Sequence, residues 1–196
     1  MKTAITGTIG AGKSTVSGMF RSMGYPVFDA DVCTHMCLRM PHPCCEEVLA
    51  AFGEELLQED GTIDRTKLGG MIFNDEERRL LLNSIVHPHV LREMLTWMDE
   101  QQSPIVFAEV ALLFEAGWDQ YFDETIVVTC TVDTAVRRMV EYRGYTEEEA
   151  HRRIRSQIDR EEQIRKGDTI FRNDGTLEQL RNAVQQWTED RRGTWN

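Results

Sequence analysis

The chain has 196 residues, of which 41% are hydrophobic and 28% are charged, and its formal net charge is −11. This length and composition predict a globular protein with one domain, large enough to carry an inserted subdomain. The acidic balance disfavours nucleic acids and membrane surfaces as partners, because Lys and Arg contacts to phosphate dominate such binding.

The first residues form a short apolar strand, 3–6, that runs into a glycine-rich turn. Residues 7–14 read GTIGAGKS and fit G-x-x-x-x-G-K-[ST], the phosphate-binding P-loop. Glycines let consecutive N–H groups point inward as an anion nest, and the helix expected at 16–23 offers its positive N-terminus to phosphates. Lys13 is expected to reach the β- and γ-phosphates, and the Ser14 hydroxyl to bind Mg²⁺. The motif between a strand and a helix predicts a nucleoside triphosphate site.

A second strand is expected at 26–28, ending at Asp29-Ala30-Asp31. The carboxyl edge of a parallel sheet is where ligands bind, and in an extended segment both carboxylates would point to the same side. A kinase often uses such a carboxylate to take the proton of the acceptor hydroxyl. The alternative is a helix N-cap followed by a solvated acid.

The interval 32–103 is mostly helical in pattern and is interpreted as an inserted helical domain. Four of the five cysteines, Cys33, Cys37, Cys44 and Cys45, lie here, and the odd total is unlike a secreted disulfide framework. We expect buried or partly exposed thiols rather than zinc, because no paired C-x₂-C occurs. With no signal peptide or apolar run of 18 residues, the expected location is the cytoplasm.

The remaining strands are expected at 104–108, 124–129 and, more weakly, 168–171. Apolar strands separated by helices predict an α/β fold of three layers, a P-loop NTPase core with a parallel five-stranded sheet. The predicted core comprises 1–31, 104–136 and 167–196, the helical substrate domain 32–103, and a helical lid 137–166.

The predicted lid has nine Lys/Arg and seven Asp/Glu, a net +2 in an acidic chain. Cations that close over a triphosphate stabilise charge in phosphoryl transfer, and closure excludes water. Most of these charges are also expected to form a solvated helix face with i,i+4 pairs, such as Glu148 with Arg152.

Several motifs indicate a small-molecule kinase. A GTPase would carry N-K-x-D, and the chain contains no Asn-Lys pair. The sequence resembles the dephospho-CoA kinase family through landmarks in order over nearly its whole length: TGTIGAGKST at 6–15, FDAD at 28–31, DGTIDR at 60–65, HP at 87–88, ALLFE at 111–115, Gln157 with REE at 160–162, and DTI with NDG at 168–175.

That resemblance implies the last step of coenzyme A biosynthesis, in which ATP phosphorylates the ribose 3′-hydroxyl of dephospho-CoA to give CoA and ADP. It implies that Asp31 activates the acceptor, with Asp29 as the next candidate, and that Thr6 and Arg138 complete the catalytic neighbourhood. The implied ATP-binding residues are Gly10, Ala11, Gly12, Lys13, Ser14 and Thr15. We expect a monomer or weak homo-oligomer.

The chain departs from the family pattern in four places. Ala111 replaces the usual proline, Glu109 stands where aspartate is common, Asp174 replaces a second asparagine, and the second lid arginine is shifted to Arg143. Two other functions stay open: another P-loop nucleoside or nucleotide kinase, and a regulator that binds ATP without an acceptor.

Overall fold

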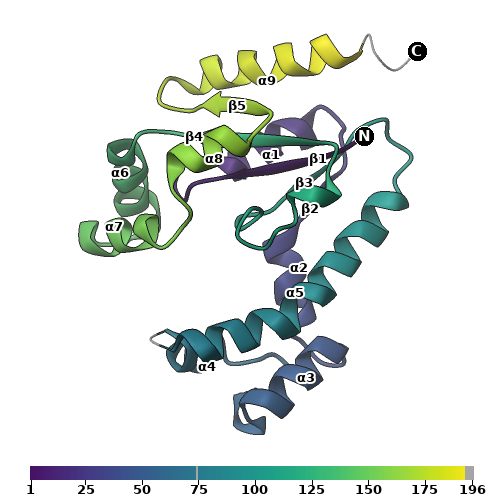
Figure 1. Ribbon diagram of the computed structural model, residues 1–196, viewed down its shortest axis with the longest axis vertical. Helices are drawn as coiled ribbons and strands as arrows, with labels where there is room; N and C mark the ends of the chain where they lie inside the picture. Colours follow the sequence, from purple (N-terminus) through teal and green to yellow (C-terminus); the bar gives the residue numbers. More distant parts are fainter. Residues whose placement is uncertain (74, 193–196) are drawn as a thin grey trace. The chain divides into compact units, whose positions relative to one another are not determined.

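The computed structural model describes residues 1–73 and 75–192, without the side chain of residue 192. It forms two compact units, which we describe separately (Figure 1). One unit comprises Met1–Phe28 and the chain from Glu100 onward, and the other is Asp29–Asp99. The expected roles of these segments as core, substrate domain and lid stay predictions.

The first unit is built on a five-stranded sheet in the order β2-β3-β1-β4-β5. Its strands are β1 (Lys2–Gly7), β2 (Val27–Asp29), β3 (Val106–Glu109), β4 (Glu124–Thr129) and β5 (Thr169–Arg172). β1 pairs in parallel with β3 and β4, and β4 pairs in parallel with β5. This confirms the predicted α/β fold with a parallel sheet. β1 is central, so the loop that follows it lies in the middle of the carboxyl edge.

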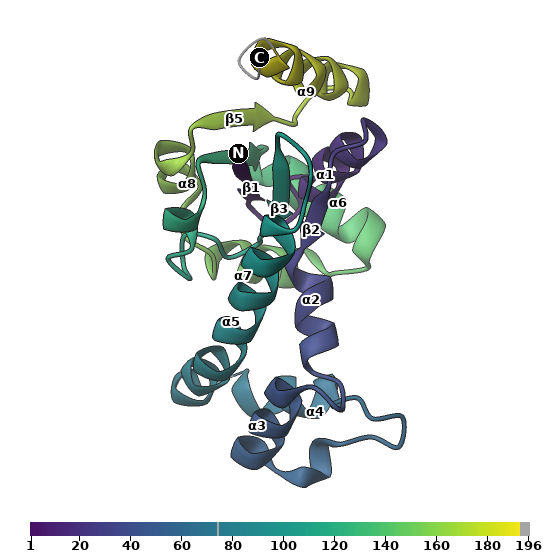
Figure 2. The same cartoon turned by 90° about the vertical axis from the view of Figure 1, so that its right-hand side faces the viewer.

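Helices cover both faces of this sheet. They are α1 (Lys13–Ser22), α6 (Val132–Arg143), α7 (Glu147–Arg155), α8 (Arg160–Lys166) and α9 (Leu177–Arg192), with a 3₁₀ turn, η2 (Asp119–Tyr121). Phe20 of α1, Phe107 of β3 and Trp187 of α9 pack together, and the Phe20 and Phe107 ring centroids are 4.0 Å apart. Figures 1 and 2 show α8 on the opposite side of the sheet from α1. The near-continuous apolar strands are therefore buried on both faces, as the sequence pattern predicts.

Within the residues described, the regular elements of the second unit are helices, and two isolated antiparallel bridges, Arg39–Thr62 and Leu57–Ile63, join its connections. Its elements are α2 (Ala30–Cys37), α3 (Pro43–Phe52), the 3₁₀ turn η1 (Glu54–Leu56), α4 (Arg65–Ile72) and α5 (Glu76–Asp99). α5 packs against α2, α3 and α4, with Val86, Val90 and Met94 buried along its length. Of the residues described, no helix combines the length and the apolar character needed to cross a membrane.

The structure corrects the sequence prediction at residues 29–31. The extended segment ends at Asp29, and Ala30 already begins α2. The Asp29 carboxylate accepts a hydrogen bond from the Val32 N–H at 3.0 Å, so it caps the helix. The expectation that both carboxylates point to the same side of an extended segment is therefore wrong. The alternative, a helix N-cap followed by an exposed acid, is confirmed, because an aspartate that can satisfy a first-turn amide favours helix initiation.

Candidate functional site

The glycine-rich loop connects the central strand directly to α1. Gly7 has φ 140°, and a Cβ atom there would lie 1.9 Å from the Val128 carbonyl oxygen of β4. Gly12 has φ 97° and precedes α1, and a Cβ atom there would lie 2.4 Å from Asn173 Nδ2. A side chain at either position would collide with neighbouring atoms in a backbone conformation that L-residues rarely adopt. The motif glycines are thus required by close packing of the loop against β4 and the segment after β5.

Lys13 begins α1 and folds back over the loop. Its Nζ donates hydrogen bonds to the Gly7 carbonyl at 2.8 Å and to the Thr8 carbonyl at 3.3 Å. Ser14 and Thr15 follow in the first turn, and both are exposed. Gly12 caps α1 without a side-chain hydrogen bond, and a helix N-terminus is a favourable place for an anion. The arrangement combines a lysine cation, a helix N-terminus and two accessible hydroxyls.

Thr6 lies one residue before Gly7 and is 1% exposed. It pairs with Val127 across the β1–β4 ladder. Thr6 is thus placed at the base of the loop, and its catalytic role stays a prediction.

Arg138 of α6 reaches the segment that follows β5. Its Nη2 donates to the Asn173 carbonyl at 2.9 Å. Asn173 in turn donates from Nδ2 to the Ala11 carbonyl of the P-loop at 2.8 Å. A guanidinium offers a fork of N–H donors that suits phosphate oxygens. Arg138, Asn173 and the loop form one connected group.

A cavity of about 220 Å³ opens beside this group. It is lined by Gly12, Thr15, Arg138, Tyr142, Asn173, Gly175 and Leu177. It joins the phosphate loop to an aromatic ring and a leucine side chain, which are surfaces suited to a nucleoside base. The sequence motif marks Asn173, but it gives no signal for Tyr142 or Leu177, because their approach depends on how α6 and β5 pack.

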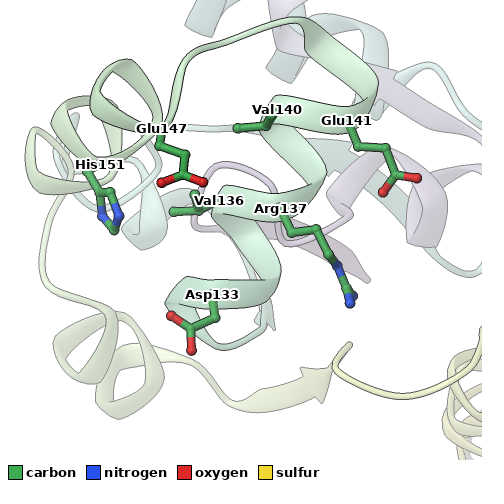
Figure 3. A pocket seen from close by; sticks show the side chains of 7 residues that line it. All are labelled: Asp133, Val136, Arg137, Val140, Glu141, Glu147 and His151. Atoms are coloured by element: carbon green, nitrogen blue, oxygen red, sulfur yellow. The ribbon is translucent and has the colours of Figure 1, made fainter.

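A larger cavity of about 460 Å³ lies between α6 and α7 (Figure 3). Its lining includes the carboxylates of Asp133, Glu141 and Glu147 and only one guanidinium, that of Arg137. Three carboxylates would repel a triphosphate. The smaller cavity, which the P-loop residues Gly12 and Thr15 help to line, is therefore the better candidate for a nucleotide site.

The acceptor-side aspartates belong to the second unit, in which Asp31 is exposed in the first turn of α2. Since the two units are described separately, the expected approach of Asp31 to the P-loop stays a prediction. The Asp29 carboxylate already caps α2, so any catalytic role of Asp29 would have to be compatible with that hydrogen bond.

The P-loop offers an oxygen atom of the kind that Mg²⁺ binds. Within the part of the chain that the structure describes, no group of three or more His, Cys, Asp or Glu side chains could hold a metal ion. Mg²⁺ at such sites typically takes one or two protein oxygens and completes its shell with phosphates and water. The exposed Ser14 hydroxyl supplies one such oxygen.

The cysteine cluster is a separate feature of the second unit. Cys37, Cys44 and Cys45 are buried and Cys33 is partly exposed, and the Cys33 and Cys37 sulfur atoms are 3.9 Å apart. Burial, followed by the neighbouring Cys37, raises the pKa of Cys33 to about 12. Burial likewise raises the pKa of Cys44 to about 12. These groups are protonated thiols at neutral pH.

Comparison with known proteins gives a consistent result. Residues 1–179 match the family described as Dephospho-CoA kinase. The chain is 40% identical over 190 residues to the Dephospho-CoA kinase of Geobacillus kaustophilus, covering 93% of this chain and 94% of that protein. It is 39% identical over 183 residues to the protein of the same name from Listeria monocytogenes, covering 92% of each.

Solved structures agree with these sequence matches. The Thermus thermophilus protein TT1252 is 35% identical, with a TM-score of 0.84 and coverage of 97% of both chains. The Dephospho-CoA kinase from Campylobacter jejuni is 28% identical, with a TM-score of 0.72 and the same coverage. A shikimate kinase from Bacteroides thetaiotaomicron, 17% identical with a TM-score of 0.55, shares the fold alone.

Proposed function

The chain belongs to the dephospho-CoA kinase family, and from this premise we propose how its own residues carry out the reaction of that family. The chain is an ATP-dependent kinase, and its substrates are ATP and dephospho-CoA. The acceptor oxygen of the ribose 3′-hydroxyl attacks the γ-phosphorus of ATP. The bond from this phosphorus to the β,γ-bridging oxygen breaks, and the products are CoA and ADP.

The residues that bind the nucleotide surround the P-loop. The loop residues from Gly10 to Thr15 bind the phosphates, and Lys13 exchanges its contacts with loop carbonyls for contacts with the β- and γ-phosphates. The nucleoside base enters the cavity beside Tyr142 and Leu177. Ser14 would hold Mg²⁺ there; the ion, when bound, neutralises phosphate charge. The observation that carries this assignment is the cavity that Gly12, Thr15 and Arg138 line beside the loop.

The residues that act on the acceptor come from the segment after β2. Asp31 takes the proton of the 3′-hydroxyl as the phosphoryl group transfers, and Thr6 supports the loop from its base. Asp29 is the weaker candidate, because its carboxylate already accepts a hydrogen bond from Val32 N–H. We also infer a cytoplasmic location and a monomeric or weakly self-associating protein.

The test measures ADP release from ATP and Mg²⁺ with and without dephospho-CoA, using wild type, Asp31→Asn and Asp29→Asn. We expect acceptor-dependent release in the wild type, reduced by roughly 10²-fold or more in Asp31→Asn and far less in Asp29→Asn. Release that survives in Asp31→Asn and disappears in Asp29→Asn would move the base role to Asp29.

The same assay separates the other functions. Stimulation by a different hydroxyl acceptor, with none by dephospho-CoA, would indicate another kinase of this fold. ATP consumption that no acceptor changes would indicate a regulator.

A further inference from the structure

The connection between α7 and α8 contacts the P-loop through one side chain. Gln157 Oε1 accepts a hydrogen bond from the Ile9 backbone N–H at 2.7 Å, in a partly buried position. Since the backbone nitrogen can only donate, the atom that faces it must be the carboxamide oxygen. Gln157 stands 148 positions from Ile9 in the sequence, so tertiary structure alone creates this contact.

The peptide unit that Gln157 holds also orients the catalytic lysine. The Ile9 N–H and the Thr8 carbonyl belong to the same planar peptide group. The Thr8 carbonyl accepts hydrogen bonds from the Ala11 N–H at 3.2 Å and from Lys13 Nζ at 3.3 Å. Fixing the N–H end of this plane therefore fixes the direction of the Thr8 carbonyl. The carbonyl direction in turn determines its hydrogen bonds with the Ala11 N–H, which closes the loop turn, and with Lys13 Nζ.

Gln157 is itself held in place by its neighbours. The N–H of Ile158 donates to Glu115 Oε1 at 3.1 Å, and Arg160 Nη1 donates to the Cys130 carbonyl, just after β4, at 3.1 Å. Both bonds attach the α7–α8 connection to the core on the C-terminal side of Gln157. The Gln157 side chain is thus presented to the loop by a fixed backbone.

The Ile9 side chain reinforces the same junction. It packs against a cluster formed by Val136 and Met139 of α6 and Ala150 of α7. The P-loop therefore contacts the α6–α7 pair through an apolar side chain and the α7–α8 connection through a backbone amide. Met139, Ala150 and Gln157 lie within 137–166, the charged helical region predicted to be a lid, whereas Val136 lies at the end of the predicted core.

We propose that Gln157 is a positioning residue of the kinase, which holds the Thr8–Ile9 peptide in the orientation that nucleotide binding requires. The inference rests on the proposed function, in that the loop binds ATP. Gln157 acts through the loop backbone. Loss of its oxygen lets the peptide plane turn, which disorganises the phosphate nest and the Lys13 contact together.

The test compares Gln157→Leu with Gln157→Glu, which keeps an acceptor oxygen, and with Gln120→Leu. Gln120 is the matched control: its Nε2 donates to the Gly117 carbonyl at 2.7 Å, before β4 and away from the loop. Titration with ADP measures nucleotide affinity without any acceptor. Hydrogen exchange of the peptide that contains Ile9 reports the loop contact directly.

We expect Gln157→Leu to weaken ADP binding and raise the KM for ATP about tenfold, the effect of one well-placed hydrogen bond. The KM for dephospho-CoA and the melting temperature should stay close to wild type. Exchange at Ile9 should accelerate in Gln157→Leu and slow again in Gln157→Glu. Gln120→Leu should leave both readouts unchanged.

Unchanged ADP affinity and unchanged exchange in Gln157→Leu would overturn the proposal. So would a rise in both KM values with a lowered melting temperature, which indicates a general structural role. If Gln157→Leu fails to fold, Gln157→Asn withdraws the oxygen by one methylene, and the same criteria apply. A wild type that binds ADP without phosphorylating dephospho-CoA would contradict the proposed function and leave the Gln157 test valid.

Discussion

At the residue scale, Arg138 can be tested against Arg137, because the two are adjacent arginines of α6 with different surroundings. Arg138 contacts Asn173 and lines the cavity beside the P-loop, whereas Arg137 is exposed. We expect Arg138→Ala to lower kcat by roughly 10²–10³-fold, since a preorganised donor that meets developing phosphoryl charge is lost. Arg138→Lys should recover little, because an ammonium cannot replace a guanidinium fork.

The control is Arg137→Ala, which should change kcat by less than about twofold, as surface substitutions usually do. Steady-state kinetics with saturating ATP and dephospho-CoA measures both variants. Equal losses in the two variants would mean that overall charge, rather than the Arg138 position, determines the effect.

The thiol of Cys33 gives a prediction that depends on pH. Its pKa is raised to about 12, chiefly by burial and then by Cys37, and only the thiolate reacts with alkylating reagents. At any pH below this raised pKa, little of the thiol is present as thiolate. Alkylation at pH 8 should therefore be at least roughly 100-fold slower than for an ordinary cysteine of pKa about 8.5. The rate should rise steadily with pH up to pH 10.

Mass spectrometry of iodoacetamide-treated protein measures this rate, with guanidinium-unfolded protein as the reference. Rapid labelling of folded Cys33 at pH 7 would contradict the described environment.

At the element scale, two glycines on either side of the loop predict opposite outcomes. Gly18 lies in the middle of α1, is exposed, and has nothing within 4 Å of a built Cβ atom. Gly18→Ala should therefore stabilise the protein by about 0.5–1 kcal/mol, because alanine loses less backbone entropy in a helix. Gly7→Ala should destabilise it by about 3 kcal/mol or more, since its Cβ would strike β4.

Urea unfolding followed by circular dichroism compares these two variants with wild type. A stabilised Gly7→Ala protein would be inconsistent with the packing of the loop against Val128.

Sequence patterns predicted the elements where side-chain periodicity is strong. The strand expected at 124–129 has the same bounds as β4, because its apolar residues are buried on both faces. The helix expected at 16–23 begins earlier, at Lys13, since the first turn carries loop residues without apolar periodicity. After β2 the extended conformation predicted for residues 29–31 was wrong and the alternative helix N-cap was right, because an aspartate before a helix and an aspartate in a strand look alike in sequence.

The site was predictable only in part. The P-loop motif is local, so its residues could be named from spacing alone. The contacts of Arg138 with Asn173 and of Gln157 with Ile9 join residues 35 and 148 positions apart. Both depend on how α6 and the α7–α8 connection pack on the sheet. Sequence landmarks included Asn173 and Gln157, but no pattern indicated what either side chain contacts.

At the scale of the whole molecule, nucleotide should stabilise one unit selectively. All P-loop residues and the cavity beside them belong to the unit that contains the sheet. Mg²⁺–ADP at 100 times its dissociation constant should stabilise that unit by about 2.7 kcal/mol by mass action. If calorimetry resolves two transitions, only the transition of the sheet-containing unit should shift.

The control ligand is inorganic phosphate at the same concentration. An equal shift with phosphate would point to a general anion effect rather than to a nucleotide site.

The strand order also governs when the protein can fold during its synthesis. The central strand β1 pairs with β3 and β4, so that Ala4 lies beside Ala108 and Thr125. The helical unit Asp29–Asp99 lies between these partners in the chain, and its helices contact one another locally. The ribosome therefore releases all of the helical unit before β1 acquires a neighbour. Early collapse of that unit shortens the effective loop to be closed and lowers the entropy cost of completing the sheet.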